Sequence, residues 1–158
     1  DFIQKTGIVT AMVGLLQAPT GTRLYERLKK EGRLLGRMTG DNADGSTNII
    51  PNNMDADTCR EGYKTILKHI YSPENYYNRI MTLFKEYKSP TIKGTIKFEH
   101  IVGLVNSIYH LGIFGKERVQ FWRLLLWTSL HRRDLFPLAV TLAVYGYHFR
   151  RVSELHVL

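Results

Sequence analysis

Apolar residues recur every three or four positions along most of the C-terminal two thirds of the chain. This spacing places them on one face of an amphipathic helix. Ser72 and Pro73 mark one helix start, because serine caps a helix and proline fits its first turn. The spacing predicts five helices, over about residues 55–71, 73–87, 98–111, 116–132 and 134–152.

The N-terminal part has a different pattern. Residues 8–16 are apolar at nearly every position, which suits a β-strand covered on both faces. A turn with Pro19 and Gly21 follows, and Thr20 or Thr22 can open a helix after it. The pattern therefore predicts one strand and one helix before the helical part of the chain.

Residues 36–53 are rich in glycine, asparagine, aspartate and threonine, which favour turns. They predict a polar linker, which we bound at 38–53, between the first part and a helical domain over 54–158. The fold class expected from these patterns is mainly α.

The last two predicted helices are apolar on almost every side, so they lie inside a bundle or face lipid. The mostly apolar stretch Leu135–Phe149 is only 15 residues long before two arginines, whereas a membrane span needs about 20 residues. Bundle packing is one alternative. The other is a peripheral membrane-association or protein-interaction module built on residues 116–152, with Trp122 and Trp127 at the interface and an anionic membrane surface as partner.

The chain has 158 residues and a formal net charge of +8, which suits an acidic partner, an anionic membrane or nucleic acid. Tyrosines and lysines alternate along residues 63–88, so an RNA-binding helical domain is a further alternative. Because these tyrosines fall on the apolar stripe, core packing explains them better and nucleic acid is a weaker expectation. The start at Asp1 suggests a fragment, and the single cysteine, Cys59, suits a cytoplasmic protein, with the membrane surface as the alternative location.

No catalytic residue and no metal site are predicted. Residues 40–47, GDNADGST, resemble a phosphate loop, but Ser46 stands where the lysine belongs. They also resemble a calcium loop, but Gly40 and Pro51 would occupy the first and last ligand positions. No histidine pair has the spacing of a zinc site.

Two sets of segments resemble one known family, the radical S-adenosylmethionine (radical SAM) proteins. The apolar run 8–16, the turn at 19–22 (PTGT), LYERL at 24–28 and EGRL at 31–34 resemble the last strand and helix of the radical SAM barrel. DNADGSTNIIP, EGYKTILKHIYSPENYYNRI, IYHLGIFGKER and LFPLAVTLAVYGYHFR resemble the uncharacterised C-terminal domain of some members, which often also carry a cobalamin-binding domain. One departure is Thr20, which separates Pro19 from Gly21.

The resemblance implies a domain organisation and a role. Residues 1–37 would be the terminal strand–helix unit left from a (β/α) barrel, followed by the linker and an accessory domain of about five helices. The parent would be an oxidoreductase or methyltransferase-like enzyme using S-adenosylmethionine, a 4Fe–4S cluster and, in some members, cobalamin. This chain lacks the CxxxCxxC loop that binds the cluster, so alone it is expected to be inactive. Its partner would be the missing barrel, whose mouth it covers to shape substrate access.

The resemblance also implies site residues. Backbone near the end of the last barrel strand lies close to the adenine of S-adenosylmethionine, which corresponds here to Gly14, Leu15, Leu16 and Gln17. The polar loop would line the open end of the barrel and hydrogen-bond substrate through Asn42, Asp44, Ser46 and Asn48.

Overall fold

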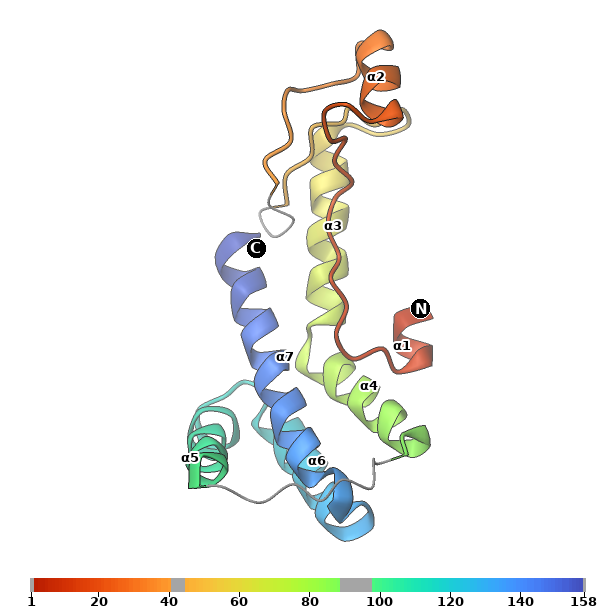
Figure 1. The fold of residues 1–158 in the computed structure, drawn as a ribbon. Helices are drawn as coiled ribbons and strands as arrows, with labels where there is room; N and C mark the ends of the chain where they lie inside the picture. The colour runs from red at the N-terminus through yellow and green to blue at the C-terminus, as the bar shows by residue number, and fades with distance from the viewer. Residues whose placement is uncertain (1, 41–44, 89–97, 158) are drawn as a thin grey trace. The chain divides into compact units, whose positions relative to one another are not determined.

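The computed structural model describes residues 2–40, 45–88 and 98–157. The described chain is mainly helical, which confirms the predicted class (Figure 1). Its elements, in order, are α1 (Phe2–Thr6), α2 (Arg23–Lys30), α3 (Ala56–Ile70), α4 (Pro73–Glu86), α5 (Phe98–Ser107), the π-helix η1 (Ile108–Ile113), α6 (Arg118–His131), the 3₁₀ turn η2 (Arg133–Leu135) and α7 (Phe136–His156).

The helix starts follow from capping side chains that the sequence identifies. Thr22 Oγ1 accepts from the backbone N–H of Tyr25 at 3.2 Å and opens α2. Ser72 Oγ accepts from the N–H of Asn75 at 3.4 Å, with Pro73 as the first residue of α4. Each cap satisfies a donor that a helix N-terminus otherwise leaves without a partner.

Two units make up the fold, and we describe each by itself. Unit 1 comprises Asp1–Ala11 and Ile70–Arg150, and unit 2 comprises Met12–His69 and Arg151–Leu158. The predicted division at residues 37 and 53 stays a prediction.

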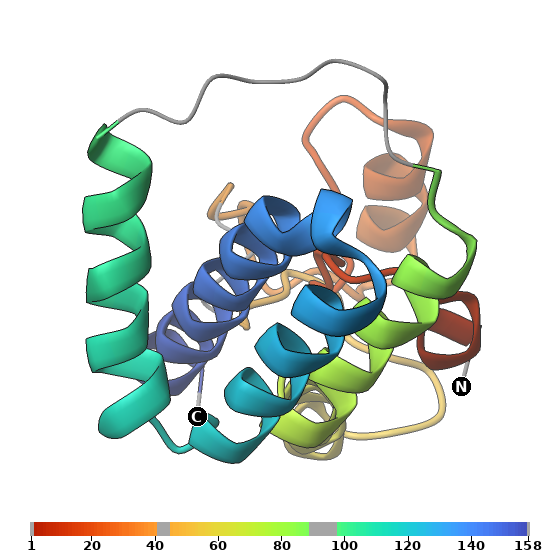
Figure 2. The same cartoon turned by 90° about the horizontal axis from the view of Figure 1, so that it is seen from below.

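In unit 1, α4 packs beside α6 (Figure 2), and α7 closes on α4 through a tyrosine ring. The Tyr76 hydroxyl donates to the carbonyl of Leu142 at 2.8 Å. Its ring lies against Gly146, where any Cβ would clash with the ring carbons. Ile80, Phe84, Phe121 and Leu124 complete this core with no exposed surface.

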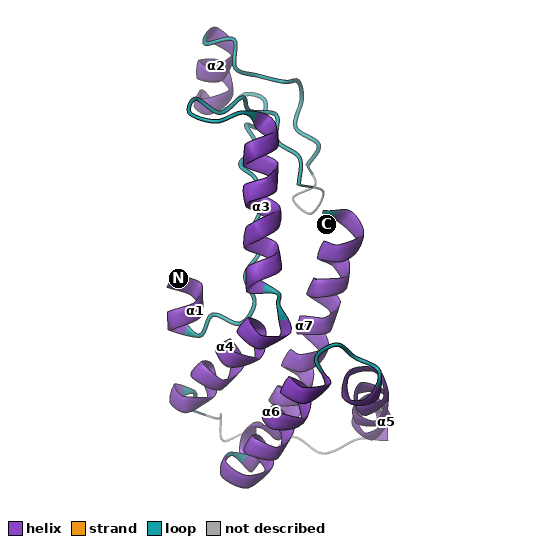
Figure 3. Ribbon diagram, turned by 180° about the vertical axis from the view of Figure 1, so that it is seen from behind, coloured by secondary structure: helices purple, strands orange, loops and turns teal. Residues whose placement is uncertain are grey.

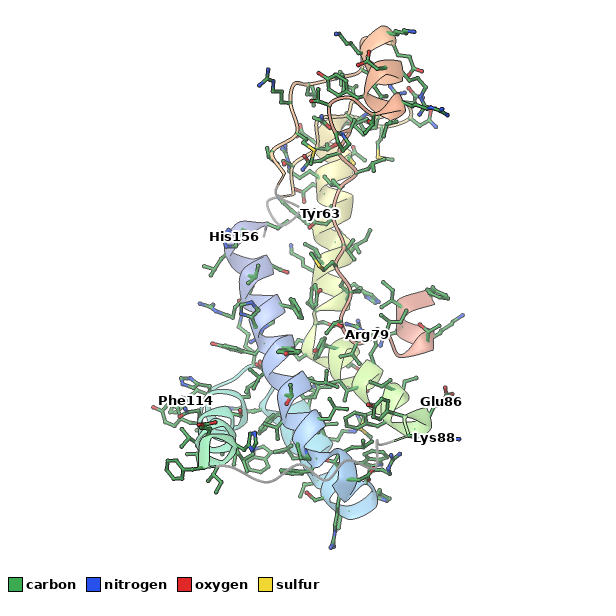
Figure 4. The ribbon with its side chains drawn as sticks, in the orientation of Figure 1. Tyr63, Arg79, Glu86, Lys88, Phe114 and His156 are labelled. Atoms are coloured by element: carbon green, nitrogen blue, oxygen red, sulfur yellow. The ribbon has the colours of Figure 1, made fainter. Side chains whose placement is uncertain are left out.

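Arg79 of α4 has no solvent exposure (Figure 4). Its guanidinium donates to Gln4 Oε1 at 2.9 Å, to the carbonyl of Ile70 at 2.6 Å and to that of Val9 at 3.5 Å. Burial lowers the pKa of Arg79, and no carboxylate in the described ranges forms an ion pair with it. Neutral oxygens therefore bind this cation and hold the N-terminal segment to α4.

The strand prediction for residues 8–16 needs correction. The segment is not helical, but the described residues form no strand, only an isolated bridge between Leu34 and Ile49 (Figure 3). It is also not covered on both faces, because Met12 is 90% exposed and Leu16 68% exposed. A strand needs a neighbouring strand to take up its backbone groups, and the described residues supply none.

Side chains take the place of a neighbouring strand along one edge of this segment. The carbonyls of Val9, Ala11 and Val13, two residues apart, accept from side chains of α3, α4 and the turn that joins them. Within unit 1 the donors are Arg79 to Val9 and Tyr71 Oη to Ala11, the latter at 2.6 Å. Within unit 2, Tyr63 Oη donates to Val13 at 3.0 Å, and residues 12–18 run along α3 (Figure 1).

The tyrosines that suggested RNA stacking are core residues. Tyr63, Tyr71, Tyr76 and Tyr77 are buried, and Tyr87 is the most exposed of the set at 37%. Base stacking needs an exposed ring face, so these positions do not offer a stacking platform.

Candidate functional site

The candidate site lies within unit 2, where the N-terminal segment ends against the loop that returns after α2. Four polar side chains meet there, those of Gln17, Thr39, Ser46 and Asn48. The loop is anchored by the Leu34–Ile49 bridge, with the N–H of Leu35 donating to the carbonyl of Asn48 at 2.9 Å. We call this group of four residues the polar cluster.

Asn48 acts as a backbone clamp and is only 4% exposed. Its Oδ1 accepts from the N–H of Ala18 at 2.8 Å, and its Nδ2 donates to the carbonyl of Ala18 at 2.9 Å. Nδ2 also donates to the carbonyl of Gly36 at 3.4 Å. The amide therefore pairs with Ala18 as a neighbouring strand would, and both of its N–H groups are used.

Gln17 connects the segment to the rest of the polar cluster and is 8% exposed. Its Nε2 donates to Thr39 Oγ1 at 3.2 Å and to Ser46 Oγ at 3.3 Å, and its Oε1 accepts from the N–H of Thr39 at 3.1 Å. The hydroxyls of Thr39 and Ser46 are 3.0 Å apart. A buried side chain bonded in this way, here that of Gln17, fixes the backbone that carries it.

Thr47 adds a further link outside the cluster. Its hydroxyl donates to the carbonyl of Leu16 at 2.6 Å and accepts from the N–H of Ile49 at 3.2 Å. Sequence reasoning did not single out Thr39 or Thr47. The sequence shows only that both residues lie in the polar stretch 36–53. Serine and threonine have no regular spacing there that would tell which side chains point inward.

The structure brings together Gln17, Ser46 and Asn48 from the predicted site residues. Gly14 and Leu16 are exposed and Leu15 is partly exposed. Asn42 and Asp44 lie outside the described residues. The binding roles of all eight stay predictions.

A second polar group lies in the interior of unit 1. Glu117 is 2% exposed, and its Oε2 is 2.7 Å from a guanidinium nitrogen of Arg150. The nearby Tyr77 hydroxyl is buried without a hydrogen-bond partner in the described part of the chain. Burial, and then the charge of Glu117, raise the pKa of Tyr77. These three residues line a cavity of about 10 Å³, space for a single water molecule.

Neither place has the composition of a metal centre. The described ranges contain no group of three or more histidine, cysteine, aspartate and glutamate side chains that could hold a metal ion. A cavity of about 90 Å³ between α4 and α6, lined by residues such as Glu74, Gln120 and Arg123, is well below the size of a ligand pocket, about 300 Å³ and above. The hydrogen bonds of the polar cluster are made partly to backbone, since Asn48 bonds both backbone groups of Ala18.

These features define a mainly helical domain with an N-terminal extended segment clamped by side chains. The chain belongs to the family described as Domain of unknown function (DUF4070), whose model matches residues 22–157. The matched residues include the helices α2 to α7 and three members of the polar cluster, Thr39, Ser46 and Asn48, but not Gln17.

Two relatives are named as methyl-transferring enzymes. The chain is 29% identical to "Uncharacterized methyltransferase sll1242" of Synechocystis sp., over 98% of this chain and 29% of that protein. It is 28% identical to "Hopanoid C-2 methylase" of Rhodopseudomonas palustris, over 91% of this chain and 28% of that protein. The chain thus spans under a third of the length of these relatives. No solved structure matches it.

Proposed function

We propose that this chain is the C-terminal accessory part of a longer radical SAM methyl-transferring enzyme, in which it covers the mouth of the barrel and shapes access to the substrate. The observation that carries the proposal is the polar cluster. It ties Gln17, at the end of the segment that resembles the last barrel strand, to Ser46 in the loop that resembles the barrel rim, and Asn48 of the same loop holds the backbone of the adjacent Ala18. The two relatives named as methyltransferase and methylase support the reaction class.

In this proposal the chain's own residues position backbone. Asn48 holds both backbone groups of Ala18, and Thr47 holds the carbonyl of Leu16. The backbone of residues 14–17 is thereby fixed just before α2. Gly14 is exposed and has no side chain, so a flat ring can approach its backbone closely. This fits the adenine of S-adenosylmethionine, which when bound supplies the radical that such enzymes use.

The residues present do not fit a 4Fe–4S cluster. Such a cluster takes several thiolates, and Cys59 is the single cysteine of the chain. The cluster, and cobalamin where it is used, would be held by other parts of the parent enzyme. No step of the reaction is assigned to this chain.

In this proposal, the polar loop is the part of the chain that contacts the substrate. Ser46 belongs to the polar cluster, and we propose that Asn42 and Asp44, outside the described residues, hydrogen-bond substrate. Hopanoids, the substrate class in the name of one relative, are apolar polycyclic compounds. An accessory domain over such a substrate would exclude water and orient the ring system more than it would supply charges.

The test uses the full-length parent enzyme and two variants that loosen the polar cluster, Gln17→Leu and Ser46→Ala. We expect methyl transfer to fall about tenfold or more, because misplaced groups lose catalytic alignment. Cleavage of S-adenosylmethionine to 5′-deoxyadenosine should continue, so the ratio of cleavage to product should rise. Asn53→Ala, an exposed change elsewhere in the linker, is the matched control.

Two results would overturn the proposal. One is unchanged coupling in both variants. The other is 5′-deoxyadenosine produced by the 158-residue chain alone when it is supplied with iron, sulfide, reductant and S-adenosylmethionine.

A further inference from the structure

Helix α6 has two apolar faces, and only one of them is buried. Phe121, Leu124 and Thr128 face the core of unit 1 with no exposed surface. The second face carries residues spaced three or four positions apart, as one stripe of a helix requires. Their exposed fractions are 68% for Val119, 41% for Trp122, 60% for Leu126 and 73% for Leu130. We call this stripe the α6 face.

The apolar surface continues from the α6 face onto η1. The indole N–H of Trp122 donates to the carbonyl of Gly112 at 3.0 Å, so the tryptophan lies where the two elements meet. Ile113 and Phe114, the next residues, are 52% and 70% exposed. Beyond them α5, which stands away from α6 in Figure 2, exposes Phe98, Ile101, Val102 and Val105.

The charges beside the α6 face are mainly positive. Arg118 precedes Trp122 by one helical turn, Arg123 follows Val119 by one turn, and both are exposed. Lys116 and Arg133 lie just beyond the two ends of the helix and are also exposed.

Two acidic groups near α6 in the described ranges are engaged in ion pairs of their own. Glu117 is buried in its pair with Arg150, and Asp134 pairs with Arg132 at 3.0 Å. Glu74 lines the small cavity that Arg123 also lines, so it can reduce the field of that one arginine.

We propose that the α6 face binds the surface of an anionic lipid bilayer, with α6 lying in the plane of the headgroups. An apolar stripe with a tryptophan and flanking arginines fits such an interface, where apolar side chains enter the acyl region and cations meet lipid phosphates. A second copy of the chain fits less well, because it would bring the same arginines face to face. None of the described helices is long and apolar enough to cross a bilayer.

The experiment measures binding of the purified chain to vesicles of phosphatidylcholine with about 30% phosphatidylglycerol, and to vesicles of phosphatidylcholine alone. Co-sedimentation gives the partition coefficient, and the fluorescence of Trp122, isolated by Trp127→Phe, reports entry into the apolar layer by a blue shift. We expect binding to the anionic vesicles, weakened by salt, and little binding to the neutral ones.

Two pairs of substitutions separate the apolar and the electrostatic contributions. Leu126→Gln with Leu130→Gln should lower the partition coefficient about tenfold or more, because two exposed side chains no longer enter the acyl layer. Arg118→Gln with Arg123→Gln should lower it about fivefold for each arginine. The matched controls are Leu35→Gln with Leu155→Gln, and Lys29→Gln with Lys30→Gln, all exposed in unit 2. Far-ultraviolet circular dichroism checks that each variant folds.

Three results would overturn the inference. The first is equal binding to neutral and anionic vesicles. The second is equal loss of binding in the α6 variants and their controls. The third is no vesicle binding at low salt together with self-association that Leu126→Gln and Leu130→Gln abolish, which would make the α6 face a protein interface.

Discussion

Asn48→Ala tests whether one side chain clamps the end of the N-terminal segment. The substitution removes the bonds of 2.8 and 2.9 Å that the amide makes to the N–H and carbonyl of Ala18. Ala18 has no exposed surface, so both backbone groups lose their partner in the interior. Each buried group left without a hydrogen bond costs about 1–3 kcal/mol. Because water can enter part of the vacated space, we expect a total loss of about 2–4 kcal/mol in the free energy of unfolding.

Two measurements check this prediction. Urea unfolding followed by circular dichroism gives the free energy, and hydrogen exchange followed by NMR gives the protection of the Ala18 amide. Asn48→Asp should also destabilise, because its second oxygen would face the Ala18 carbonyl as an acceptor against an acceptor. Asn53→Ala removes an exposed asparagine and should change neither quantity by more than about 0.5 kcal/mol. If Asn48→Ala left the exchange of the Ala18 amide unchanged, the clamp would be refuted.

Three further predictions concern unit 1 and the start of α3. Gly146→Ala should destabilise the protein by about 1–3 kcal/mol in thermal melts, because the new methyl group meets the Tyr76 ring. Tyr76→Leu in the same chain should restore part of the loss. A melting temperature equal to that of the wild type in Gly146→Ala would contradict this packing. Glu117→Gln should cost about 2–4 kcal/mol in urea because it removes the carboxylate that pairs with the Arg150 guanidinium. Adding Arg150→Met should recover part of the loss, whereas simple additivity would argue against the pair. The pKa of Asp55 is held below its ordinary value of 3.8, chiefly by a backbone N–H in the first turn of α3 and then by a threonine hydroxyl. A lowered folded pKa gives stability that is present above the unfolded pKa and is lost as pH falls through the folded pKa. Asp55→Asn, which keeps a hydrogen-bond acceptor but does not titrate, should therefore flatten the dependence of stability on pH below about pH 4. An NMR titration that gave the Asp55 carboxyl group its ordinary pKa would disprove the effect.

Helices α3 and α4 could be predicted from sequence because each has an apolar stripe and an identifiable start, and α6 and α7 because each is a long apolar run. For α3, α4 and α6 the predicted bounds differ from the observed ones by at most two residues. Helix α7 continues four residues past the predicted end at Val152, and two of these, Glu154 and Leu155, are good helix formers. The π-helical turn η1 and the short α1 have no periodic signal, since one is a local change of hydrogen-bond register and the other is barely more than one turn.

The N-terminal segment shows where sequence patterns stop being informative. Its apolar residues predict a strand, but a strand exists only where a neighbour accepts and donates backbone hydrogen bonds. Here Tyr63, Tyr71 and Arg79 donate hydrogen bonds to the carbonyls along one edge of the segment. Their side chains lie 50 to 70 positions further along the chain, and no pattern in residues 8–16 predicts them.

The polar cluster was predictable in part. A resemblance to a family identified Gln17, Ser46 and Asn48 as residues of interest. The structure joins Gln17 to Ser46 through a hydrogen bond, and Asn48 bonds the backbone of Ala18 beside Gln17. What the sequence could not supply is the direction of each side chain. Asn48 points into the protein and is occupied by backbone, and Thr39 completes the network from outside the predicted set.

The environment of Arg79 has a practical consequence for anyone who trims this protein. The family match starts at residue 22, so a fragment cut to that limit would lose both Gln4 and Val9, two of the oxygens that solvate the guanidinium. The cation would then remain in an apolar interior with fewer ligands, and α4 would have to open to water to relieve it. The smallest stable piece should therefore begin near residue 2, some twenty positions before the family match begins.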